Sequence, residues 1–352
     1  MNNCAVGIHD IAVYIPENKI TLEKLVQHRS NESPELAPKL ERAVATTGQK
    51  ALRFPSLYQD NSVLAAQAAH TLLQQNTDYS AENLRYLTVG TETSVDHSKP
   101  IAAYVQGMLK NSGLDIPNSL STFQVQHACA GGTAAMLSVA GMLQAAGRDS
   151  ESGLVISSDI ARYQASTTAE ITQGAGAAAM LLSRNPALLE LDLASAGYNS
   201  NDVDDFFRPL GSITAKVKGS YSVQCYHDAF TAALKNHADR LGSSPAEVLK
   251  NTDIFALHVP FRNMAYNALM QAVQTYLGFS EAEAESFLTK RGFTQALETP
   301  AQTGNIYSGS LYMTLAYSLQ ERHQHFGDQI CGKRTLIISY GSGNTMLIVG
   351  GK

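Results

Sequence analysis

The chain has 352 residues, of which 44% are hydrophobic and 16% are charged, and its formal net charge at pH 7 is −5. The hydrophobic fraction is sufficient for a sizeable core and excludes a disordered chain, while the negative charge argues against a general nucleic-acid-binding protein. The charged fraction lies well below the roughly 25% of average soluble proteins, so we expect a partner subunit or thick layering to cover much of the surface.

The chain contains four cysteines: Cys4, Cys129, Cys225 and Cys331. None of them forms a CxxC pair, so the sequence predicts neither a zinc site nor a disulfide framework. Residues 1–20 lack a basic segment and a long apolar stretch, which predicts no signal peptide and a cytoplasmic protein. Residues 116–147 carry no Asp, Glu, Lys or Arg, but their polar side chains and their many Ala and Gly residues favour a buried helix over a membrane span.

Short apolar segments that are typical of strands alternate with longer helical segments along the chain. The predicted strands are 6–15, 86–89, 121–125, 154–158, 175–182, 254–259 and 335–339. The predicted helices are 62–75, 101–110, 133–146, 228–240, 261–276, 281–290 and 310–320. Such alternation indicates an α/β protein with layered sheets and helices, and no flexible linker divides the chain.

One arrangement occurs twice. The predicted strand in 153–158 is followed by a glycine-rich turn and a second strand in 174–182, and the strand 335–339 is followed in the same way by 341–349. Glycine turns between strands are common, so this repetition alone is weak. It favours two similar halves that meet near residue 185.

Cys129 lies in the segment QHACAGGT (126–133), between a predicted strand and an Ala-rich helix. At such a junction the free backbone N–H groups and the helix dipole lower the pKa of a thiol and favour the nucleophilic thiolate. A buried structural cysteine is the alternative, and the local sequence leaves both interpretations open.

Glu92 and Asp96 follow the predicted strand that ends at Val89, in the segment GTETSVDHSKP. Ligands of α/β folds usually bind just beyond the carboxyl ends of strands, so Glu92 is a candidate catalytic carboxylate. Capping of the next helix is the simpler interpretation for both residues.

Two further junctions and one turn carry candidate residues. His258, in FALHVPF, ends a predicted strand and suits proton transfer near neutral pH. Asn305, in TGNIYSGS, precedes a predicted helix, and the amides of the turn SYGSG (339–343) suit the binding of an oxyanion. Taken singly, each has a plain structural alternative. His258 can be a structural histidine with its hydrogen bonds satisfied, Asn305 an ordinary turn residue, and 339–343 a plain hairpin turn.

Taken together, these residues lie at junctions that lead into helices or at strand ends, as expected for one site at one edge of a layered fold. In order and context they also resemble one family. The segments that carry the resemblance are 90–100, 128–133, 158–163 with 172–180, 205–209 with 219–226, 258–261, 304–312 and 339–343. The sequence resembles 3-hydroxy-3-methylglutaryl-CoA synthases, which belong to the thiolase superfamily with ketoacyl-carrier-protein synthase III.

The resemblance implies a five-layered αβαβα thiolase fold made of two similar halves. It divides the chain into an N-terminal half, 1–185, with Glu92 and Cys129, and a C-terminal half, 186–352, with His258, Asn305 and the glycine turn. It also implies a homodimer, which would account for the small charged fraction.

The activity that the resemblance implies is an acyl-thioester condensation by a ping-pong mechanism. Cys129 takes an acetyl group, with the oxyanion held by the backbone amides of Cys129 and Ser342. Glu92 then forms a carbanion that attacks a 3-ketoacyl thioester oriented by His258 and Asn305, and water releases the product. Neither a metal nor a separate cofactor is implied, because acyl-CoA or acyl-carrier-protein thioesters are the substrates.

The same resemblance assigns supporting or substrate-binding roles to a further set of residues: Asp96, Asp159, Tyr163, Asp205 and Arg262. Two departures from the family pattern concern the substrate. Ala130 replaces the usual aromatic residue after the nucleophile, and the stretch after His258 offers Arg262 in place of the usual lysines.

These departures keep two alternatives open beside a synthase of mevalonate or polyketide biosynthesis. One is a β-branching enzyme or acyltransferase of secondary metabolism that uses carrier-protein-bound acyl groups. The other is a non-catalytic subunit of a thiolase-type complex, against which the joint presence of Cys129, Glu92, His258 and Asn305 speaks. A decarboxylating ketoacyl synthase is disfavoured because it has no need of Glu92.

Overall fold

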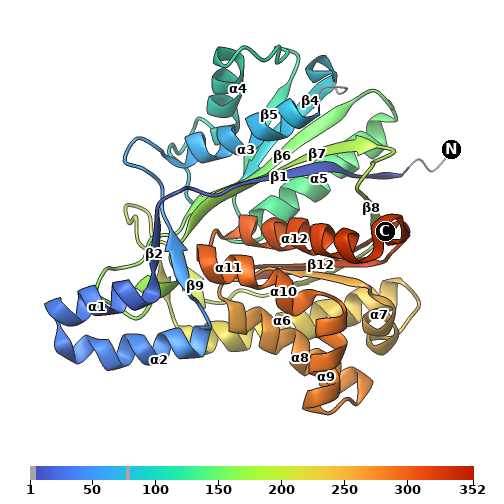
Figure 1. Cartoon of the computed structure of the whole chain (residues 1–352). Coiled ribbons are helices and arrows are strands. Elements are labelled where there is room, and N and C mark those ends of the chain that lie inside the picture. The colour runs from blue at the N-terminus through green and yellow to red at the C-terminus, as the bar shows by residue number, and fades with distance from the viewer. Residues whose placement is uncertain (1–4, 77–79) are drawn as a thin grey trace.

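The computed structural model describes residues 5–76 and 80–352 (Figure 1). In this part of the chain a nine-stranded mixed sheet has the order β11-β12-β13-β8-β1-β7-β6-β4-β5. Its strands are β1 (Val6–Tyr14), β4 (Leu84–Gly90), β5 (Ser121–Val125), β6 (Ser152–Ile160), β7 (Ala175–Arg184), β8 (Leu189–Ser200), β11 (Ile254–Leu257), β12 (Thr335–Gly341) and β13 (Thr345–Gly351). The predicted strands all occur, whereas β8 was not predicted.

The sheet consists of two parts with the same pairing pattern. In the first part β4 runs parallel to β6, β6 antiparallel to β7, and β7 antiparallel to β1. In the second part β11 runs parallel to β12, β12 antiparallel to β13, and β13 antiparallel to β8. The parts join where β1 meets β8, at Gly7 opposite Glu190 and Ile8 opposite Leu189. The expected two similar halves are therefore confirmed.

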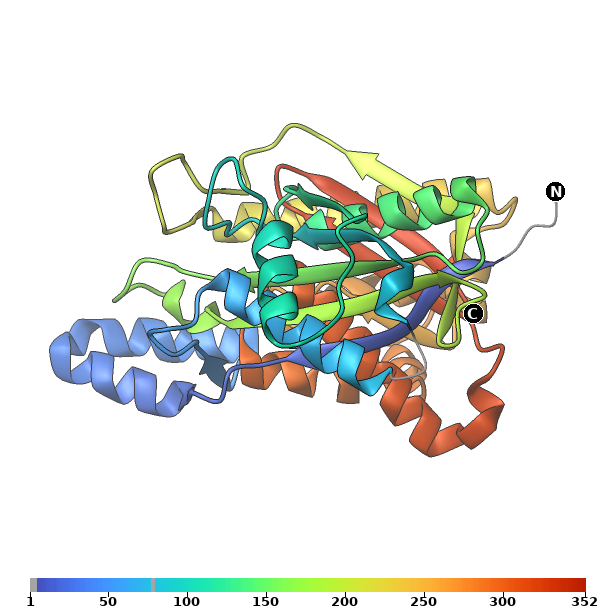
Figure 2. The ribbon, with the colours of Figure 1, turned by 90° about the horizontal axis from the view of Figure 1, so that it is seen from above.

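Three layers of helices enclose the two parts of the sheet (Figures 1 and 2). The outer helices of the first half are α3 (Asn61–Gln75) and α4 (Ile101–Asn111), and those of the second half are α6 (Gly219–Arg240) and α8 (Arg262–Leu277). Between the halves lie α5 (Gly131–Ala146) and α12 (Ser308–Phe326). This is the five-layered αβαβα thiolase fold.

The period-2 alternation of strands explains how each sheet serves two cores. On β7, Ala179 and Leu181 join the core beneath α3 and α4, whereas Met180 and Leu182 join the central core around α5 and α12. Because both faces of such strands are covered, their sequences are continuously apolar, which is why they could be predicted from the sequence.

Helix α5 belongs to the stretch without charges. By length and composition residues 128–146 are apolar enough to cross a membrane, yet 56% of that segment is buried inside the fold. It is the central helix that the sequence predicted.

Smaller elements complete the chain. They are β2 (Lys19–Thr21), α1 (Leu22–Glu32), α2 (Ala37–Thr47), β3 (Ala51–Arg53), β9 (Phe206–Phe207), β10 (Lys216–Val217), α7 (Pro245–Asn251), α9 (Glu281–Lys290), α10 (Phe293–Ala296) and α11 (Glu298–Thr303). Figures 1 and 2 both show the α1–α2 pair at one end of the molecule. Among these, only α9 was predicted.

Two local predictions need correction. The connection between β6 and β7 is no simple turn, because residues 161–174 form a longer segment with a 3-10 helix at Glu170–Thr172. Helix α6 begins at Gly219 instead of residue 228. Cys4 lies outside the described residues.

Candidate active site

A close contact between two glycines brings the strand end of Glu92 to the helix start of Cys129. A Cβ atom on Gly90 would lie only 2.2 Å from the backbone nitrogen of Gly132, so β4 and α5 approach more closely than larger residues allow. Ala128, which precedes the cysteine, adopts a left-handed φ of 41° that turns the chain sharply. As a result, Cys129 Sγ donates a hydrogen bond to Glu92 Oε1 at 3.4 Å.

The charge around Cys129 differs from the sequence-based expectation. Burial, followed by the carboxylates of Glu92 and Asp159, raises the pKa of the Cys129 thiol well above its usual value. The prediction of a thiolate favoured by the helix start was wrong, because it ignored carboxylates that only the fold brings near. Cys129 is therefore a thiol in this structure, and it donates its hydrogen bond to Glu92.

Glu92 lies between a second carboxylate and a guanidinium. Asp159 Oδ1 accepts hydrogen bonds from the Glu92 amide at 3.0 Å and from the hydroxyls of Thr91 and Thr93 at 2.8 and 2.7 Å. Arg208 Nη1 lies 3.2 Å from Glu92 Oε2. Burial raises the pKa of Glu92 while Arg208 opposes that shift, and burial together with Glu92 raises the pKa of Asp159 to about 8.

His258 lies beyond the end of β11, where Ser310 of α12 holds its ring. The distance between His258 Nδ1 and Ser310 Oγ is 2.9 Å, and the same hydroxyl donates to the carbonyl oxygen of Tyr307 at 2.9 Å. Burial lowers the pKa of His258 to about 3, so the imidazole is neutral at physiological pH. A neutral ring offers one hydrogen-bond donor and one acceptor.

Asn305 is positioned by another close approach of backbones. A Cβ atom on Gly304, whose φ is +86°, would lie 1.8 Å from the carbonyl oxygen of Gln173. Asn305 Oδ1 accepts a hydrogen bond from the Tyr307 amide at 2.8 Å, which fixes the amide group of Asn305. Tyr163 lines the same cavity as Asn305.

The glycine turn between β12 and β13 is held from behind by Asp205. This buried carboxylate accepts hydrogen bonds from the Tyr340 hydroxyl at 2.7 Å and from the Gly343 amide at 2.9 Å. Asp205 therefore fixes the turn that carries Ser342.

A cavity of about 750 Å³ brings these groups together. Of the predicted residues, those that line it are Cys129, Tyr163, His258, Asn305 and Ser342. Lys39 and Arg42 of α2 also line it and are exposed to solvent, so the cavity extends from cationic side chains at the surface to the nucleophile.

Of the other predicted residues, Glu92 and Asp205 do not line the cavity but are hydrogen-bonded to Cys129 and Tyr340, which do, and Asp159 is hydrogen-bonded to the Glu92 amide. The last two lie away from the cavity. Asp96 is exposed, and its carboxylate accepts hydrogen bonds from the amides of Ser98 and Lys99 within its own loop. The acid beside Glu92 is Asp159 instead. Arg262 does not line the cavity and pairs with Glu298 at 3.2 Å.

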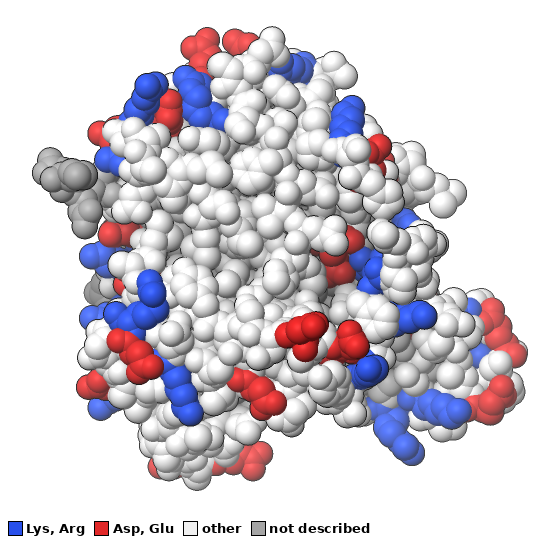
Figure 3. All heavy atoms as spheres, turned by 180° about the vertical axis from the view of Figure 1, so that it is seen from behind, with Lys and Arg blue, Asp and Glu red and all other residues white. Residues whose placement is uncertain are grey.

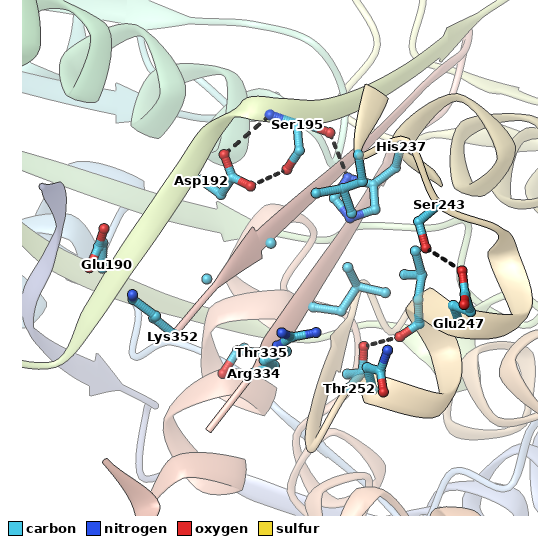
Figure 4. A pocket seen from close by; sticks show the side chains of 16 residues that line it. Glu190, Asp192, Ser195, His237, Ser243, Glu247, Thr252, Arg334, Thr335 and Lys352 are labelled. Atoms are coloured by element: carbon cyan, nitrogen blue, oxygen red, sulfur yellow. Dashed lines mark hydrogen bonds between the residues drawn. The ribbon is translucent and has the colours of Figure 1, made fainter. Parts of the chain in front are cut away.

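A second cavity of about 510 Å³ contains none of the predicted residues (Figure 4). Its polar groups bond mainly to one another: His237 Nδ1 lies 2.6 Å from the carbonyl oxygen of Ser195, and the Ser195 hydroxyl donates to Asp192 at 2.6 Å. The candidate reactive groups are thus in the first cavity.

The sequence analysis missed several residues of the site: Lys39, Arg42, Arg208 and Tyr307. Arg208 was part of a segment that carried the family resemblance, but its contact with Glu92 spans 116 positions in the sequence. Lys39 and Arg42 belong to α2, which was not predicted at all.

Comparisons with known proteins agree with this arrangement. Residues 3–187 match the family model described as hydroxymethylglutaryl-coenzyme A synthase N terminal, and residues 278–351 match the corresponding C-terminal model. The hydroxymethylglutaryl-CoA synthase of Enterococcus faecalis is 28% identical over 96% of this chain and 80% of its own length. The human mitochondrial hydroxymethylglutaryl-CoA synthase is 27% identical over 96% and 71%, respectively.

Solved structures are similar over nearly the whole chain. MvaS in complex with 3-hydroxy-3-methylglutaryl coenzyme A has a TM-score of 0.85 and 32% identity, covering 99% of this chain and 84% of that one. The curacin-pathway HMG synthase shares the fold with a TM-score of 0.85 at 24% identity, over 99% and 79%. These findings support a condensing enzyme and not a non-catalytic subunit. The chain belongs to the hydroxymethylglutaryl-CoA synthase family and is an acyltransferase that condenses acyl thioesters.

Proposed function

We propose that this chain joins an acetyl group on Cys129 to the ketone of a 3-ketoacyl thioester and releases the product by hydrolysis. One observation carries the proposal: Cys129 lines a cavity together with His258 and Asn305, and its thiol contacts Glu92. A nucleophile, a carboxylate base and two neutral polar groups are what such a condensation requires.

In the first half-reaction, the sulfur of Cys129 attacks the carbonyl carbon of acetyl-CoA. The thiol proton ends on the sulfur of CoA, which departs as its thiol, and an acetyl thioester remains on the enzyme. The amides of Cys129 and Ser342 stabilise the oxyanion of the tetrahedral intermediate, with Asp205 holding the turn of Ser342 in place.

In the second half-reaction, Glu92 removes a proton from the methyl group of the acetyl thioester. The carbanion attacks the ketone carbon of the acceptor, whose oxygen becomes an alkoxide and takes up a proton. His258 and Asn305 orient that ketone, while Tyr163 and Asp159 support Asn305 and Glu92. Water then cleaves the thioester bond to Cys129.

The mass of the intact protein after incubation with acetyl-CoA tests the first step. We expect the gain of one acetyl group on Cys129, followed by its loss with formation of a new thioester when acetoacetyl-CoA is added. Acetylation of another cysteine, or of none, would contradict the proposal.

The carrier of the acyl group is a separate question. Lys39 and Arg42, which line the outer part of the cavity, support binding of the phosphates of CoA. Arg262 is engaged with Glu298, so the stretch after His258 supplies no free cation in the way usual for the family. This pairing, together with Ala130, favours carrier-protein thioesters as the second candidate substrates.

A matrix of donors and acceptors, each offered on CoA and on a carrier protein, separates the two candidates. A kcat/KM for acetoacetyl-CoA above that of every carrier-bound acyl group identifies a CoA-dependent synthase. The reverse order identifies a β-branching enzyme.

We propose further that the protein is a homodimer. Figure 3 shows a broad area of the back of the molecule with few charged side chains. Helix α5 of the central layer exposes Met142 by 39% and carries no charged residue. A second copy would cover such a surface. Sedimentation of the purified protein measures the oligomeric state.

The boundary of the halves and the compartment are also proposals. A division between residues 185 and 186 is supported by β7 ending at Arg184 and β8 beginning at Leu189. The described cysteines, Cys129, Cys225 and Cys331, are all free thiols, which supports a cytoplasmic location.

A further inference from the structure

Arg208 makes three contacts with Glu92 and Tyr307, next to the cavity that Cys129 and Tyr307 line. Its Nη1 lies 3.2 Å from Glu92 Oε2 and donates a hydrogen bond to the backbone oxygen of Glu92 at 2.7 Å. Its Nη2 donates to the hydroxyl of Tyr307 at 3.0 Å. Arg208 thus bridges the strand end of the first half and the start of α12 in the second.

The two oxygens of Glu92 face different partners. Oε2 faces the guanidinium, and Oε1 accepts the hydrogen bond from Cys129 Sγ. An acetyl group on Cys129 would be attached to that sulfur, so Oε1 is the oxygen closest to the methyl group from which a proton must be removed. Arg208 therefore fixes the rotation of the carboxylate that brings Oε1 to the reacting group.

The charge of this cluster depends on one cation. The side chains of Glu92 and Arg208 are only 6% and 13% exposed. The titratable groups that act electrostatically on Glu92 come from five elements or loops: Cys129, Asp159, Tyr163, Arg208 and Tyr307. Arg208 is the only cation in this set. Glu92 is the carboxylate that Arg208 contacts, and without the guanidinium a negative charge on this buried group would have no cationic partner in the set.

We propose that Arg208 is a positioning residue for carbon–carbon bond formation, which keeps Glu92 ionised and turned toward the acyl group on Cys129. The inference rests on the proposed function. In the step concerned, a proton moves from the acetyl methyl group to Glu92 Oε1 and the C–H electron pair becomes the attacking carbanion. Arg208 takes no part in the bond changes and acts through the carboxylate alone.

The test is the pH profile of the two half-reactions in Arg208→Gln and Arg208→Lys. An adjacent opposite charge shifts the pKa of a carboxylate by about 1–3 units. The acid limb of the profile is the pH range in which the condensation rate falls as the pH is lowered. In Arg208→Gln, we therefore expect this acid limb to move upward by about one to three pH units. The condensation rate should recover in part at high pH. Acetylation of Cys129 should fall by a smaller factor. In Arg208→Lys, the positive charge is kept, so the acid limb should stay near that of the wild type. The condensation rate at the pH optimum should fall, because lysine cannot donate to Glu92 and Tyr307 at once as the guanidinium does.

Arg240→Gln is the matched control, since this exposed arginine donates to the carbonyl oxygen of Ala194 outside the cavity. It should leave both half-reactions unchanged. An unshifted limb in Arg208→Gln, with both half-reactions lowered equally, overturns the inference, because it is the signature of a merely structural residue. Should Arg208→Gln not fold, equal losses in both half-reactions of Arg208→Lys overturn it in the same way, and a selective loss of condensation supports it.

The wild-type control separates this inference from the proposed function. Wild-type protein that takes up no acetyl group on Cys129 contradicts the proposed function and the role of Arg208 with it. Wild-type protein that condenses normally beside an Arg208→Gln variant with an unshifted limb contradicts the role of Arg208 alone.

Discussion

The two halves of the molecule place different chemistry on the same framework. In the first half, Glu92 follows β4 and Cys129 precedes α5. In the second, His258 follows β11 and Asn305 precedes α12. The strand pairing around β4 and β11 is the same, so these positions correspond.

The difference between the halves is one of charge. The first half contributes Glu92 and Asp159, and it brings the nucleophile to a carboxylate. The second half contributes a histidine that burial keeps neutral, an amide, and the guanidinium of Arg208, which faces Glu92. Under the proposed function, the first half generates the nucleophiles of the reaction, and His258 and Asn305 of the second half present neutral hydrogen-bonding groups to a carbonyl.

The strongest way to break this comparison is to remove the nucleophile of the first half. Cys129→Ser should abolish acetyl transfer, because a serine hydroxyl ionises far less than a thiol and the nearby carboxylates oppose its ionisation further. Incubation with acetyl-CoA followed by mass analysis measures the effect.

Cys331→Ser is the control for this variant, since Cys331 is an exposed free thiol. It should acetylate at the wild-type rate. An adduct mapped to another cysteine, with full activity in Cys129→Ser, would remove Cys129 from the mechanism.

The second prediction concerns the base. Glu92→Gln should still acquire an acetyl group, since thioester exchange requires only that the thiol proton leave. Condensation should fall by about 10²–10⁴-fold, the usual contribution of a general base. Mass analysis and chromatography of the product on the same sample measure the two steps.

Equal rates of condensation in Glu92→Gln and the wild type would remove Glu92 from the mechanism as the base. The hydrogen bond from Cys129 to Glu92 adds a finer expectation: acetylation slows, but by less than condensation does. Complete loss of acetylation would instead make Glu92 the base for both steps.

How much of this site could be read from the sequence depends on the range of the contacts. Strand and helix junctions near Cys129, Glu92 and His258 are local, and they were predicted correctly. The raised pKa of Cys129 was not, because it arises from Asp159 and Glu92, which only tertiary structure brings near. The contact between Arg208 and Glu92 bridges distant segments and left no local signal.

The long strand β8 and the helix α2 show a second limit. Strand β8 alternates buried and exposed positions imperfectly and contains Gly197, which weakens its strand pattern. Helix α2 has Pro38 near its start, and its Leu40 packs in a small separate cluster with residues of α1 and β3, not in the main cores. The part that α2 plays in lining the cavity therefore could not be predicted from the alternation of strands and helices.

The third prediction tests the neutral character of the second half through stability. In the folded protein, burial lowers the pKa of His258 to about 3, whereas an unfolded histidine has a pKa near 6.5. Between these values the unfolded chain binds a proton that the folded chain does not. The contribution of His258 to the free energy of unfolding is therefore complete above about pH 6.5. As the pH falls below that value, the contribution is lost at up to about 1.4 kcal/mol per pH unit.

Urea unfolding of the wild type and of His258→Gln at several pH values between 4.5 and 7 measures this effect. The free energy of unfolding should fall less steeply with acid in the variant. If the free energy of unfolding depended on pH equally in both proteins, His258 would take up a proton in the folded chain as it does in the unfolded one. The second half would then carry a charged group where the comparison assigns a neutral one.

The last prediction, with the smallest expected effect, concerns the cationic side chains at the mouth of the cavity, where the two halves meet. Helix α2 comes from the first half but contacts α8 of the second: Asn263 Nδ2 donates to the carbonyl oxygen of Thr46 at 2.9 Å. Lys39 and Arg42 are exposed there, so a phosphate bound to them remains partly hydrated and each contact is worth up to about 1 kcal/mol.

Replacing both Lys39 and Arg42 by alanine should raise KM for acetyl-CoA roughly three- to tenfold with kcat unchanged. The rise in KM should be smaller at high salt. Acetyl-pantetheine, which lacks the phosphates, serves as the control substrate, and its KM should not change. An equal rise for both substrates would show that α2 shapes the cavity without binding phosphate, and the cations for the carrier would have to come from elsewhere.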